Sequence, residues 1–257
     1  MGQGMLAIIS DIHANAEALE VVLADIARQN IAQIYCLGDI IGYGPNPVEC
    51  LDKALAFDMS LLGNHEEAVL NGAFGMNQLA KEAIDWTREQ LQTGSSGDRP
   101  RWDFLQELPL TFVEDDLLFV HGSPRDPTTE YILRSDTEDL FGEVPEKVKA
   151  WFSLVPRLCF VGHTHTPGII TEDSQFLAPH EFGHHFRFDQ DRRYICNVGS
   201  VGQPRDGNNK ACYTTYDRAA GTLTYHRLDY PFSVTAKKIR DNPRLGERNA
   251  ERLEKGC

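Results

Sequence analysis

Short runs of apolar residues recur along the first two thirds of the chain, and a polar motif follows each run. The runs are rich in β-branched residues and cover Leu6–Ile9, Ile34–Leu37, Met59–Leu62, Leu117–Val120 and Leu158–Val161. Continuous apolar runs of this length are typical of strands that are buried on both faces. The pattern therefore predicts five buried strands.

Apolar residues at helical spacing lie between or beside these runs. They repeat at steps of three and four residues in four stripes, at Leu19–Ile26, Val48–Leu55, Met76–Leu91 and Val148–Val155. Pro47 directly precedes the second stripe, and Pro145 lies three residues before the fourth. Proline is favoured in the first turn of a helix. Strand and helix thus alternate, and this alternation predicts parallel pairing through crossover helices.

The last third of the chain has a different pattern. Residues 211–216 and 222–228 flank a Gly-containing loop, which predicts a hairpin. Ile169–Ile170 and Tyr194–Val198 are further strand candidates, and Ser233 is a candidate cap for a short final helix through Ile239. We expect a surface loop at 93–100 and a long loop or mobile hairpin at 172–193. No repeat or linker divides the chain, so we predict one α/β domain over residues 1–257 with two sheets.

Charge and composition exclude several classes of protein. Among 257 residues, 25 Lys and Arg stand against 38 Asp and Glu, for a net charge of −13, which disfavours stable binding to nucleic acid or an anionic membrane. No apolar run approaches the roughly 20 residues of a membrane span, and the start of the chain has no signal-peptide pattern. Met5 is a candidate natural start, in which case residues 1–4 would be an expression remnant.

The six cysteines are widely spaced and form no Cys-x-x-Cys motif. Cys36, Cys159 and Cys196 lie inside apolar runs, where a buried free thiol is expected. This usage indicates a reducing compartment, so we expect a cytoplasmic protein without a disulfide framework.

Each buried run ends at residues that bind metals or carry out acid–base chemistry. Ligand sites in α/β sheets lie outside the carboxyl ends of the strands, so we expect these residues to form one site, with the glycines at 38, 63, 122 and 162 allowing a tight turn at the strand ends. The candidate ligands are Asp11, His13, Asp39, Asn64, His121, His163 and His165.

The donor types indicate transition metals. Carboxylate and neutral imidazole suit Mn, Fe, Zn, Co or Ni, and thiolate is absent from the set. Seven candidate ligands are too many for one tetrahedral ion, whereas a carboxylate that bridges two ions about 3.5–4 Å apart would use them all. We therefore predict two divalent transition-metal ions per chain.

The motifs occur in a fixed order between residues 5 and 165: Asp-x-His, Gly-Asp, Gly-Asn-His-Glu, His-Gly and Gly-His-Thr-His. Because it carries these motifs in this order, the chain resembles the calcineurin-like metallophosphoesterases. The run Asn-Val-Gly-Ser-Val-Gly-Gln-Pro-Arg-Asp-Gly at 197–207 resembles a loop of their small bacterial and archaeal branch. The resemblance implies a four-layer α-β-β-α sandwich of two mixed sheets with outer helices, and hydrolysis of phosphate esters by a hydroxide that bridges the metals.

The resemblance also implies a role for each residue of the motifs. One metal would be held by Asp11, His13 and His165, and the other by Asn64, His121 and His163, with Asp39 bridging them. His65 would lie beside the substrate, where it protonates the leaving group or stabilises the transferring phosphoryl group. Glu66 would orient or tune His65.

Two arginines are candidate contacts to the substrate phosphate, together with Asn64 and His65. Arg125 and Arg205 lie in loops, and a guanidinium group binds phosphate oxygens in a bidentate manner. The alternative for each is an ion pair within its own loop, with Asp126 or Asp206.

One departure from the wider family bears on the substrate. Protein phosphatases and dinucleoside tetraphosphatases of this superfamily usually continue Gly-Asp-x-x-Asp-Arg-Gly, whereas residues 38–44 here are Gly-Asp-Ile-Ile-Gly-Tyr-Gly. This favours a small phosphate ester as substrate, a diester rather than a monoester. The alternatives are a non-catalytic metal-binding interaction scaffold and a Ser/Thr protein phosphatase. The pattern does not distinguish a monomer from an oligomer.

Overall fold

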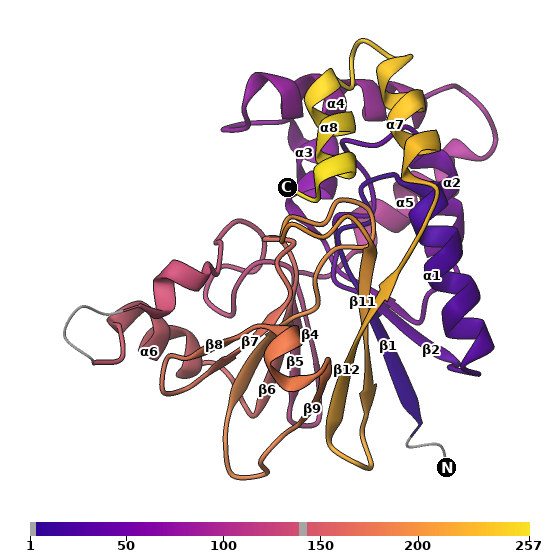
Figure 1. The fold of residues 1–257 in the computed structure, drawn as a ribbon. Coiled ribbons are helices and arrows are strands. Elements are labelled where there is room, and N and C mark those ends of the chain that lie inside the picture. Colours follow the sequence, from indigo (N-terminus) through magenta and orange to yellow (C-terminus); the bar gives the residue numbers. More distant parts are fainter. Residues whose placement is uncertain (1–3, 139–142) are drawn as a thin grey trace.

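The computed structural model describes residues 4–138 and 143–257, and in it the strands form two mixed six-stranded sheets (Figure 1). Residues 1–3 of the candidate expression remnant lie outside the described residues. The first sheet has the order β3 (Met59–Ser60), β2 (Gln33–Cys36), β1 (Met5–Ile9), β11 (Ala211–Asp217), β12 (Thr222–Leu228) and β9 (His185–Arg187). The second has the order β4 (Thr111–Glu114), β5 (Leu117–Val120), β6 (Leu158–Val161), β10 (Tyr194–Asn197), β7 (Gly168–Thr171) and β8 (Phe176–Leu177).

The strands that carry the predicted motifs pair in parallel. In the first sheet, β1 pairs with β2 and β2 with β3 in parallel. In the second sheet, β5 pairs with β6 in parallel. The predicted hairpin is confirmed as the antiparallel pair β11 and β12, and β11 joins it to β1. Parallel pairing brings the carboxyl ends of β1, β2 and β3 to one end of the molecule.

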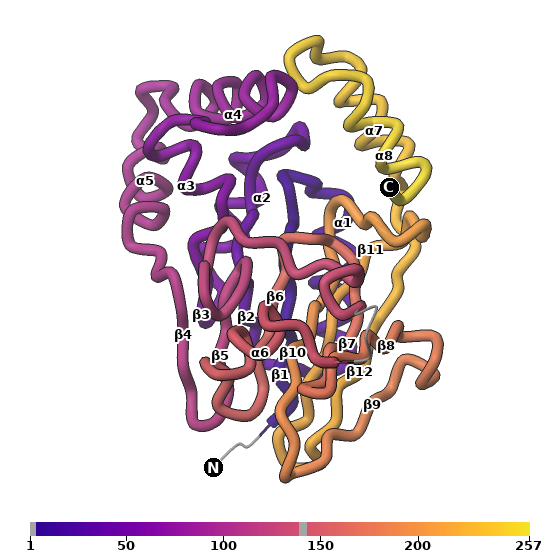
Figure 2. Tube along the Cα trace, turned by 90° about the vertical axis from the view of Figure 1, so that its left-hand side faces the viewer, coloured from indigo at the N-terminus to yellow at the C-terminus, as the bar shows by residue number. Residues whose placement is uncertain are grey.

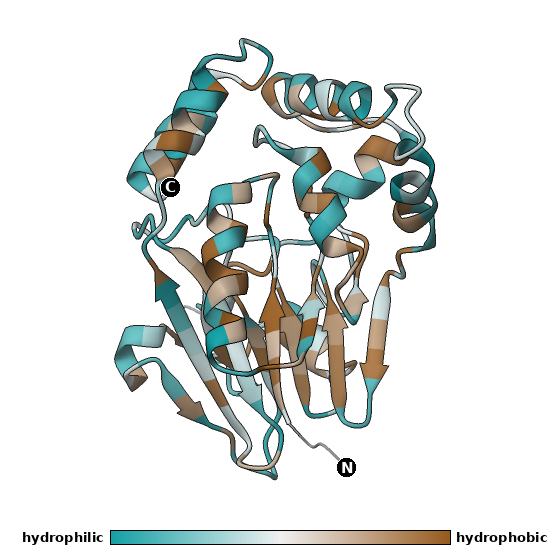
Figure 3. Cartoon of the chain, turned by 90° about the vertical axis from the view of Figure 1, so that its right-hand side faces the viewer, coloured by the Kyte–Doolittle hydropathy of each residue, from teal (hydrophilic) through white to brown (hydrophobic). Residues whose placement is uncertain are grey.

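The helices lie outside the two sheets (Figures 1 and 3). Their bounds are α1 Ala16–Arg28, α2 Pro47–Ala54, α3 Asn64–Asn71, α4 Gln78–Gln90, α5 Asp98–Glu107, α6 Glu146–Phe152, α7 Phe232–Arg240 and α8 Glu247–Lys255. Asn15 caps α1 through a bond from Ala18 N–H to its side-chain oxygen. None of the described helices is both long and apolar enough to cross a bilayer.

Alternate residues of the strands supply three separate cores, which produce the four layers. Leu6 and Ile8 of β1 face the core between the sheets, whereas Ala7 and Ile9 face the core under α1 and α2. Phe160 of β6 lies in the core between the sheets, whereas Cys159 and Val161, which flank it along the strand, lie in the core under α6. Because the side chains of a strand alternate between faces, both faces of these strands are buried, and the apolar runs are continuous. The predicted α-β-β-α sandwich is thus confirmed.

A further layer of helices covers the end of the sheets to which β1 runs (Figures 1 and 2). In it, α7 and α8 pack against α4 through a small apolar cluster that includes Ala83, Ile239 and Leu253. The C-terminal part of the chain thereby covers the same end of the molecule at which the ligand motifs lie.

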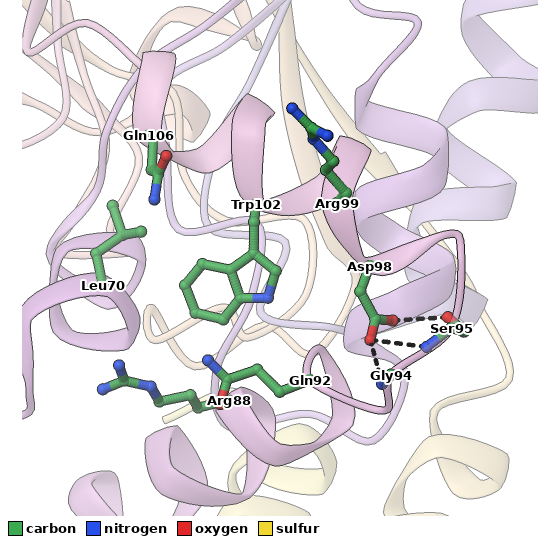
Figure 4. A pocket seen from close by; sticks show the side chains of 9 residues that line it. All are labelled: Leu70, Arg88, Gln92, Gly94, Ser95, Asp98, Arg99, Trp102 and Gln106. Atoms are coloured by element: carbon green, nitrogen blue, oxygen red, sulfur yellow. Dashed lines mark hydrogen bonds between the residues drawn. The ribbon is translucent and has the colours of Figure 1, made fainter.

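Several sequence expectations are wrong in detail. The segment 93–100 is a loop only to Gly97, because the Asp98 carboxylate accepts bonds from the N–H groups of Gly94 and Ser95 at the start of α5 (Figure 4). Ser233 is not a cap, since α7 begins at Phe232 and α8 follows it. The sequence pattern also missed α3, α5 and β4.

The segment 172–193 is likewise more ordered than expected. It contains β8, a 3₁₀ turn at Pro179–Phe182 and β9. Its two strands do not pair with each other as a hairpin, because β8 extends the second sheet and β9 the first. The segment therefore connects an outer strand of one sheet to an outer strand of the other.

We expect Phe160→Ala to lower the free energy of unfolding by about 3–5 kcal/mol. The Phe160 ring is fully buried, stacks on Phe119 at a centroid distance of 5.2 Å and meets Tyr216 of the other sheet at 5.6 Å. Denaturant unfolding measures the loss, with the half-exposed Leu154→Ala as the control variant. Equal losses in the two variants would contradict the assignment of Phe160 to the core between the sheets.

Candidate metal centre

The predicted ligands from both sheets meet at one place. Asp11, His13, Asp39 and Asn64 follow strands of the first sheet, and His121, His163 and His165 follow strands of the second. All except Asn64 are buried. The centre therefore lies across the junction of the two sheets, at the end covered by α3, α4, α7 and α8 (Figure 1).

The glycines at the strand ends meet two different constraints. Of the four, only Gly38 has a positive φ, of 103°. Gly162 instead allows a close approach: a Cβ atom there would lie 2.0 Å from Ser10 Oγ and 2.5 Å from Asp11 Oδ2. The predicted tight turn is confirmed at Gly162, where Thr164 N–H donates to Gly162 O at 2.7 Å. Space around the chain is thus a second constraint at these positions, beside the positive φ of Gly38.

One cluster combines Asp11, His13 and His165. The His165 Nε2 atom is 3.2 Å from Asp11 Oδ1 and 3.0 Å from His13 Nε2. The Asp11 Oδ1 atom is buried and has no hydrogen-bond partner among the described residues. Its other oxygen, Oδ2, accepts a bond from His163 N–H.

The second cluster combines Asp39, His121 and His163. The His121 Nε2 atom is 3.1 Å from His163 Nδ1, 3.1 Å from Asn64 Oδ1 and 3.4 Å from Asp39 Oδ2. The same Asp39 Oδ2 atom is 3.7 Å from His13 Nε2 of the first cluster. A single carboxylate oxygen thus faces both clusters, which is the position of a bridging ligand.

Backbone carbonyl groups orient all four histidine rings. His13 Nδ1 faces Ile41 O at 3.3 Å and His121 Nδ1 faces Leu37 O at 3.0 Å. His165 Nδ1 faces Gln203 O at 2.5 Å, and His163 Nε2 faces Thr129 O at 3.2 Å. Because a carbonyl oxygen only accepts, each of these nitrogens carries the proton, and the opposite nitrogen of a neutral ring directs a lone pair into the centre. Metal-ligating histidines have this arrangement.

The donor set fits divalent transition metals. The inward nitrogen atoms of His13 and His165 face each other at 3.0 Å, and those of His121 and His163 at 3.1 Å. Facing lone pairs repel unless a cation or a proton lies between them, and the unpartnered Asp11 oxygen adds a negative charge at the same place. Imidazole with carboxylate is the ligand set of Mn, Fe, Zn, Co and Ni.

Burial and mutual charge set the pKa values of the centre. Burial raises the pKa of Asp39, but the adjacent His121 and His65 outweigh it and hold the pKa well below its usual range. Burial lowers the pKa of His121, yet the Asp39 carboxylate raises it to about 9. Burial and His121 lower the pKa of His163 to about 3. The Asp39 carboxylate is thus ionised and His163 is neutral near pH 7, as metal ligation requires, whereas His121 would have to release a proton to bind a metal.

The backbone at the centre adopts an uncommon conformation. Five candidate ligands have positive φ angles between 46° and 64°: Asp11, His13, Asp39, His163 and His165. Positive φ in residues other than Gly costs about 1–3 kcal/mol each and persists only where surrounding structure enforces it. Bonds between the ligand loops provide this support, from His13 N–H to Asp39 O and from Asp11 N–H to Gly38 O.

The 197–207 run supports the same loops. Ser200 Oγ donates to Asp11 O at 2.8 Å, and Gly202 N–H donates to the same carbonyl group at 2.9 Å. Gln203, in the same run, supplies the carbonyl oxygen that orients His165. The run that resembles a family loop therefore shapes the centre from its backbone.

Glu66 is not placed as the resemblance implied. Its carboxylate accepts bonds from three backbone N–H groups, those of Asp39 (2.8 Å), Gly63 (3.0 Å) and Ile41 (3.1 Å). Among the described contacts, none of its hydrogen bonds goes to His65. Its position is that of a support for the loop that carries Asp39 and for the first turn of α3.

His65 lies at the edge of the first cluster. Its Nε2 atom is 4.0 Å from Asp39 Oδ2, and its buried Nδ1 atom has no described partner. The ring packs against Tyr43 at 4.4 Å and against the backbone of Gly42, where a Cβ atom would lie 2.0 Å from Nδ1. Burial and Arg205 lower the pKa of His65 to about 4 although Asp39 opposes them.

The two candidate arginines differ in position. Arg125 forms an ion pair with Glu130 rather than with Asp126. The Arg205 guanidinium donates to Gln203 Oε1 at 2.7 Å and lies 5.9 Å from the centre of the Tyr43 ring. Asp206 pairs with Arg227, so the alternative of an ion pair between Arg205 and Asp206 is wrong. Arg205 thus faces the side of the centre on which Tyr43 and His65 lie.

Sequence reasoning missed the groups that surround the ligands. Tyr131 stacks on His163, with ring centroids 3.9 Å apart and an angle of 24° between the planes. The carbonyl groups that orient the histidines belong to Leu37, Ile41, Thr129 and Gln203. Every residue has a carbonyl group, so no side-chain pattern could have identified them.

An open hollow of about 670 Å³ lies elsewhere, between α3, α4 and α5 (Figure 4). Arg88, Asp98 and Trp102 are among its lining residues, and none of the residues that line it belongs to the candidate centre. The Asp98 carboxylate in this hollow accepts hydrogen bonds from Gly94 N–H and Ser95 Oγ of the preceding loop.

The fold and the buried Asp and His clusters define a metal-dependent phosphoesterase. Residues 5–201 match the family model described as calcineurin-like phosphoesterase, and the chain belongs to this family. It is 36% identical over 261 residues, 98% of each chain, to uncharacterized protein MJ0912 of Methanocaldococcus jannaschii.

Two solved structures are similar over nearly the whole chain. A metallophosphoesterase from Sphaerobacter thermophilus matches with a TM-score of 0.80 and 35% identity, over 98% of this chain and 99% of that one. Hypothetical protein PH1004 from Pyrococcus horikoshii OT3 shares the fold, with a TM-score of 0.73 and 18% identity over 98% of each chain.

We expect Glu66→Gln to weaken the centre without touching a candidate ligand. An amide group in place of the carboxylate leaves at least one of the three buried N–H groups without an acceptor, which costs about 1–3 kcal/mol. Metal affinity should fall about 10- to 100-fold, as when other supports of metal ligands are removed. Calorimetric titration with Mn²⁺ measures it, and the exposed Glu107→Gln is the control. Unchanged affinity in Glu66→Gln would refute the supporting role.

Proposed function

We propose that the chain hydrolyses small phosphate esters with two divalent metal ions, and phosphodiesters in preference to monoesters. The observation that carries the proposal is the position of Asp39 Oδ2, which lies 3.7 Å from His13 Nε2 and 3.4 Å from His121 Nε2. A carboxylate that faces two clusters of imidazoles is suited to join two ions in one site. The completeness of both clusters supports an enzyme rather than an interaction scaffold.

The residues that would hold the ions follow from the two clusters. Asp11, His13 and His165 would hold one ion, Asn64, His121 and His163 the other, and Asp39 both. When bound, two such ions make hydroxide available near neutral pH and neutralise charge on the phosphoryl oxygens. The carbonyl groups behind the rings keep the ligand nitrogens aimed inward and restrict their tautomers.

His65 is placed to act on the leaving group. Its ring is buried against Tyr43 and Gly42, which restricts its motion, and its Nε2 atom is directed toward the side on which Asp39 lies. From this position we propose that its N–H donates a hydrogen bond to the oxygen that leaves phosphorus. Such assistance matters most for esters whose alcohol is a poor leaving group.

The two candidate arginines differ in how far each is free to contact a substrate. Arg125 is neutralised by Glu130, whereas Arg205 is held by the neutral Gln203 side chain and lies next to the centre. We propose that Arg205 contacts the phosphoryl oxygens and that Arg125 does not.

The cysteines support a reducing compartment. Five of the six are buried free thiols: Cys36, Cys50, Cys159, Cys196 and Cys212. Buried free thiols are usual where disulfides do not form, which supports the proposed cytoplasmic location. Mn, Fe, Zn, Co and Ni all remain compatible with the donor set.

A rate comparison tests the proposal. Protein that is stripped of metal and reloaded with Mn²⁺ should turn over methyl 4-nitrophenyl phosphate faster than 4-nitrophenyl phosphate, and a chelator should abolish both rates. Asp39→Asn should cost about 3 kcal/mol or more of transition-state stabilisation, about 100-fold in kcat/KM. The exposed Asp103→Asn is its control. Faster turnover of the monoester would overturn the diester preference, and full activity of Asp39→Asn would overturn the site.

His65→Ala tests the role of that ring separately. The variant should keep its metal content and lose about 10²–10⁴-fold in kcat, with the larger losses for alkyl than for nitrophenyl leaving groups. Metal content by elemental analysis and rates over a leaving-group series give the answer, with the exposed His185→Ala as control. Equal losses across the series would exclude assistance to the leaving group, and loss of metal would make His65 a ligand.

A further inference from the structure

A cavity of about 420 Å³ opens beside the candidate metal centre. Its volume lies within the range of pockets that hold small organic ligands. Asn64 and His163 line it and also belong to the centre, so the cavity is continuous with the place where a phosphoryl group would bind. Its other walls come from α3, from the loop at 72–76 and from the segment that contains Thr129 and Tyr131.

Aromatic and apolar side chains form part of the lining. One face of the Tyr131 ring stacks on His163, and the side chain is still 44% exposed, so its other face is open. Phe74 is 87% exposed, more than any other large apolar residue among the described part of the chain, and Met76 lies near it in the lining. Exposed aromatic rings at the mouth of a polar site mark a surface that a ligand covers.

The polar groups of the lining restrict the kind of ligand. The residues that line the cavity include Glu67, Asn71 and Thr129, whose hydroxyl donates to Asp126 Oδ2, but no Lys or Arg. A second anionic group would be repelled by Glu67 and would find no cation. A plain hydrocarbon chain would cover the side chains of Glu67 and Asn71 without offering them a partner, which carries a free-energy cost.

A flat heteroaromatic ring with hydrogen-bonding edges satisfies both parts of the lining. We propose that this cavity binds the nucleobase of a nucleoside phosphate ester, with Tyr131 and Phe74 as stacking surfaces and the polar side chains at the edge of the base. The proposal rests on the proposed function for the placement of the phosphoryl group. It assigns Phe74 and Tyr131 as determinants of specificity that act on the organic part of the substrate.

Calorimetric titration of the Mn²⁺-loaded protein with matched probes tests the assignment. Adenosine 5′-monophosphate should bind at least about 5-fold more tightly than ribose 5-phosphate, since stacking of one base on aromatic side chains contributes about 5- to 150-fold in affinity. Phe74→Ala should reduce that ratio by about 5-fold or more and leave the affinity for inorganic phosphate unchanged. Leu110→Ala, an exposed apolar residue between α5 and β4 that does not line the cavity, serves as the matched control.

Tyr131 needs a pair of variants because its ring touches a candidate ligand. Tyr131→Phe keeps the stacking surface and should preserve the ratio, whereas Tyr131→Ala should lower it. Elemental analysis of Tyr131→Ala separates loss of the stacking surface from loss of metal. Equal effects of the two substitutions would overturn the stacking role of this ring.

Two further probes separate this proposal from the proposed function. Adenosine without phosphate should still bind measurably better than ribose, and Phe74→Ala should abolish the difference. If inorganic phosphate fails to bind while adenosine binds, the proposed function fails and the cavity assignment stands. Equal affinities of adenosine 5′-monophosphate and ribose 5-phosphate would overturn the assignment. Tighter binding of octyl phosphate than of adenosine 5′-monophosphate would overturn it in favour of a hydrocarbon tail.

Discussion

The packing of one sheet on the other is the constraint on which the rest of the structure depends. Neither sheet holds a complete set of metal ligands: Asp11 and His13 come from the first sheet, and His165, which completes their cluster, comes from the second. The second cluster is divided in the same way between Asp39 and the pair His121 and His163. The core between the sheets, with Phe160 against Tyr216, therefore sets the distances in the centre as well as the stability of the fold.

The candidate centre is then shaped by groups outside the set of candidate ligands. Carbonyl oxygens decide which nitrogen of each histidine faces inward, and Glu66 holds the loop of Asp39 through three N–H groups. Burial alone would raise the pKa of the carboxylates, but the imidazoles around them keep them ionised. The geometry of the centre thus depends on backbone contacts as much as on the motif residues.

The sequence predicted those parts of the molecule that repeat a simple pattern. The five buried strands could be predicted because both faces of each strand are apolar, which gives a continuous apolar run. The candidate ligands could be predicted because they follow directly after these runs. Short or partly exposed elements such as β4 and β9 carry no such pattern, and α5 begins inside a segment whose composition is that of a loop. The supporting role of Glu66 and the cavity at Phe74 and Tyr131 depend on contacts between distant segments, which spacing along the chain does not encode.

The left-handed backbone at Asp11, His13, Asp39, His163 and His165 has a consequence for attempts to transplant this chemistry. Copying the seven side chains onto another α/β scaffold would reproduce the ligands but not the turns that aim them. An ordinary strand end relaxes to negative φ and directs the same side chains elsewhere. A transplanted centre would have to include the backbone of the paired loops after β1 and β2. It would also need the 197–207 run, whose hydrogen bonds support these loops.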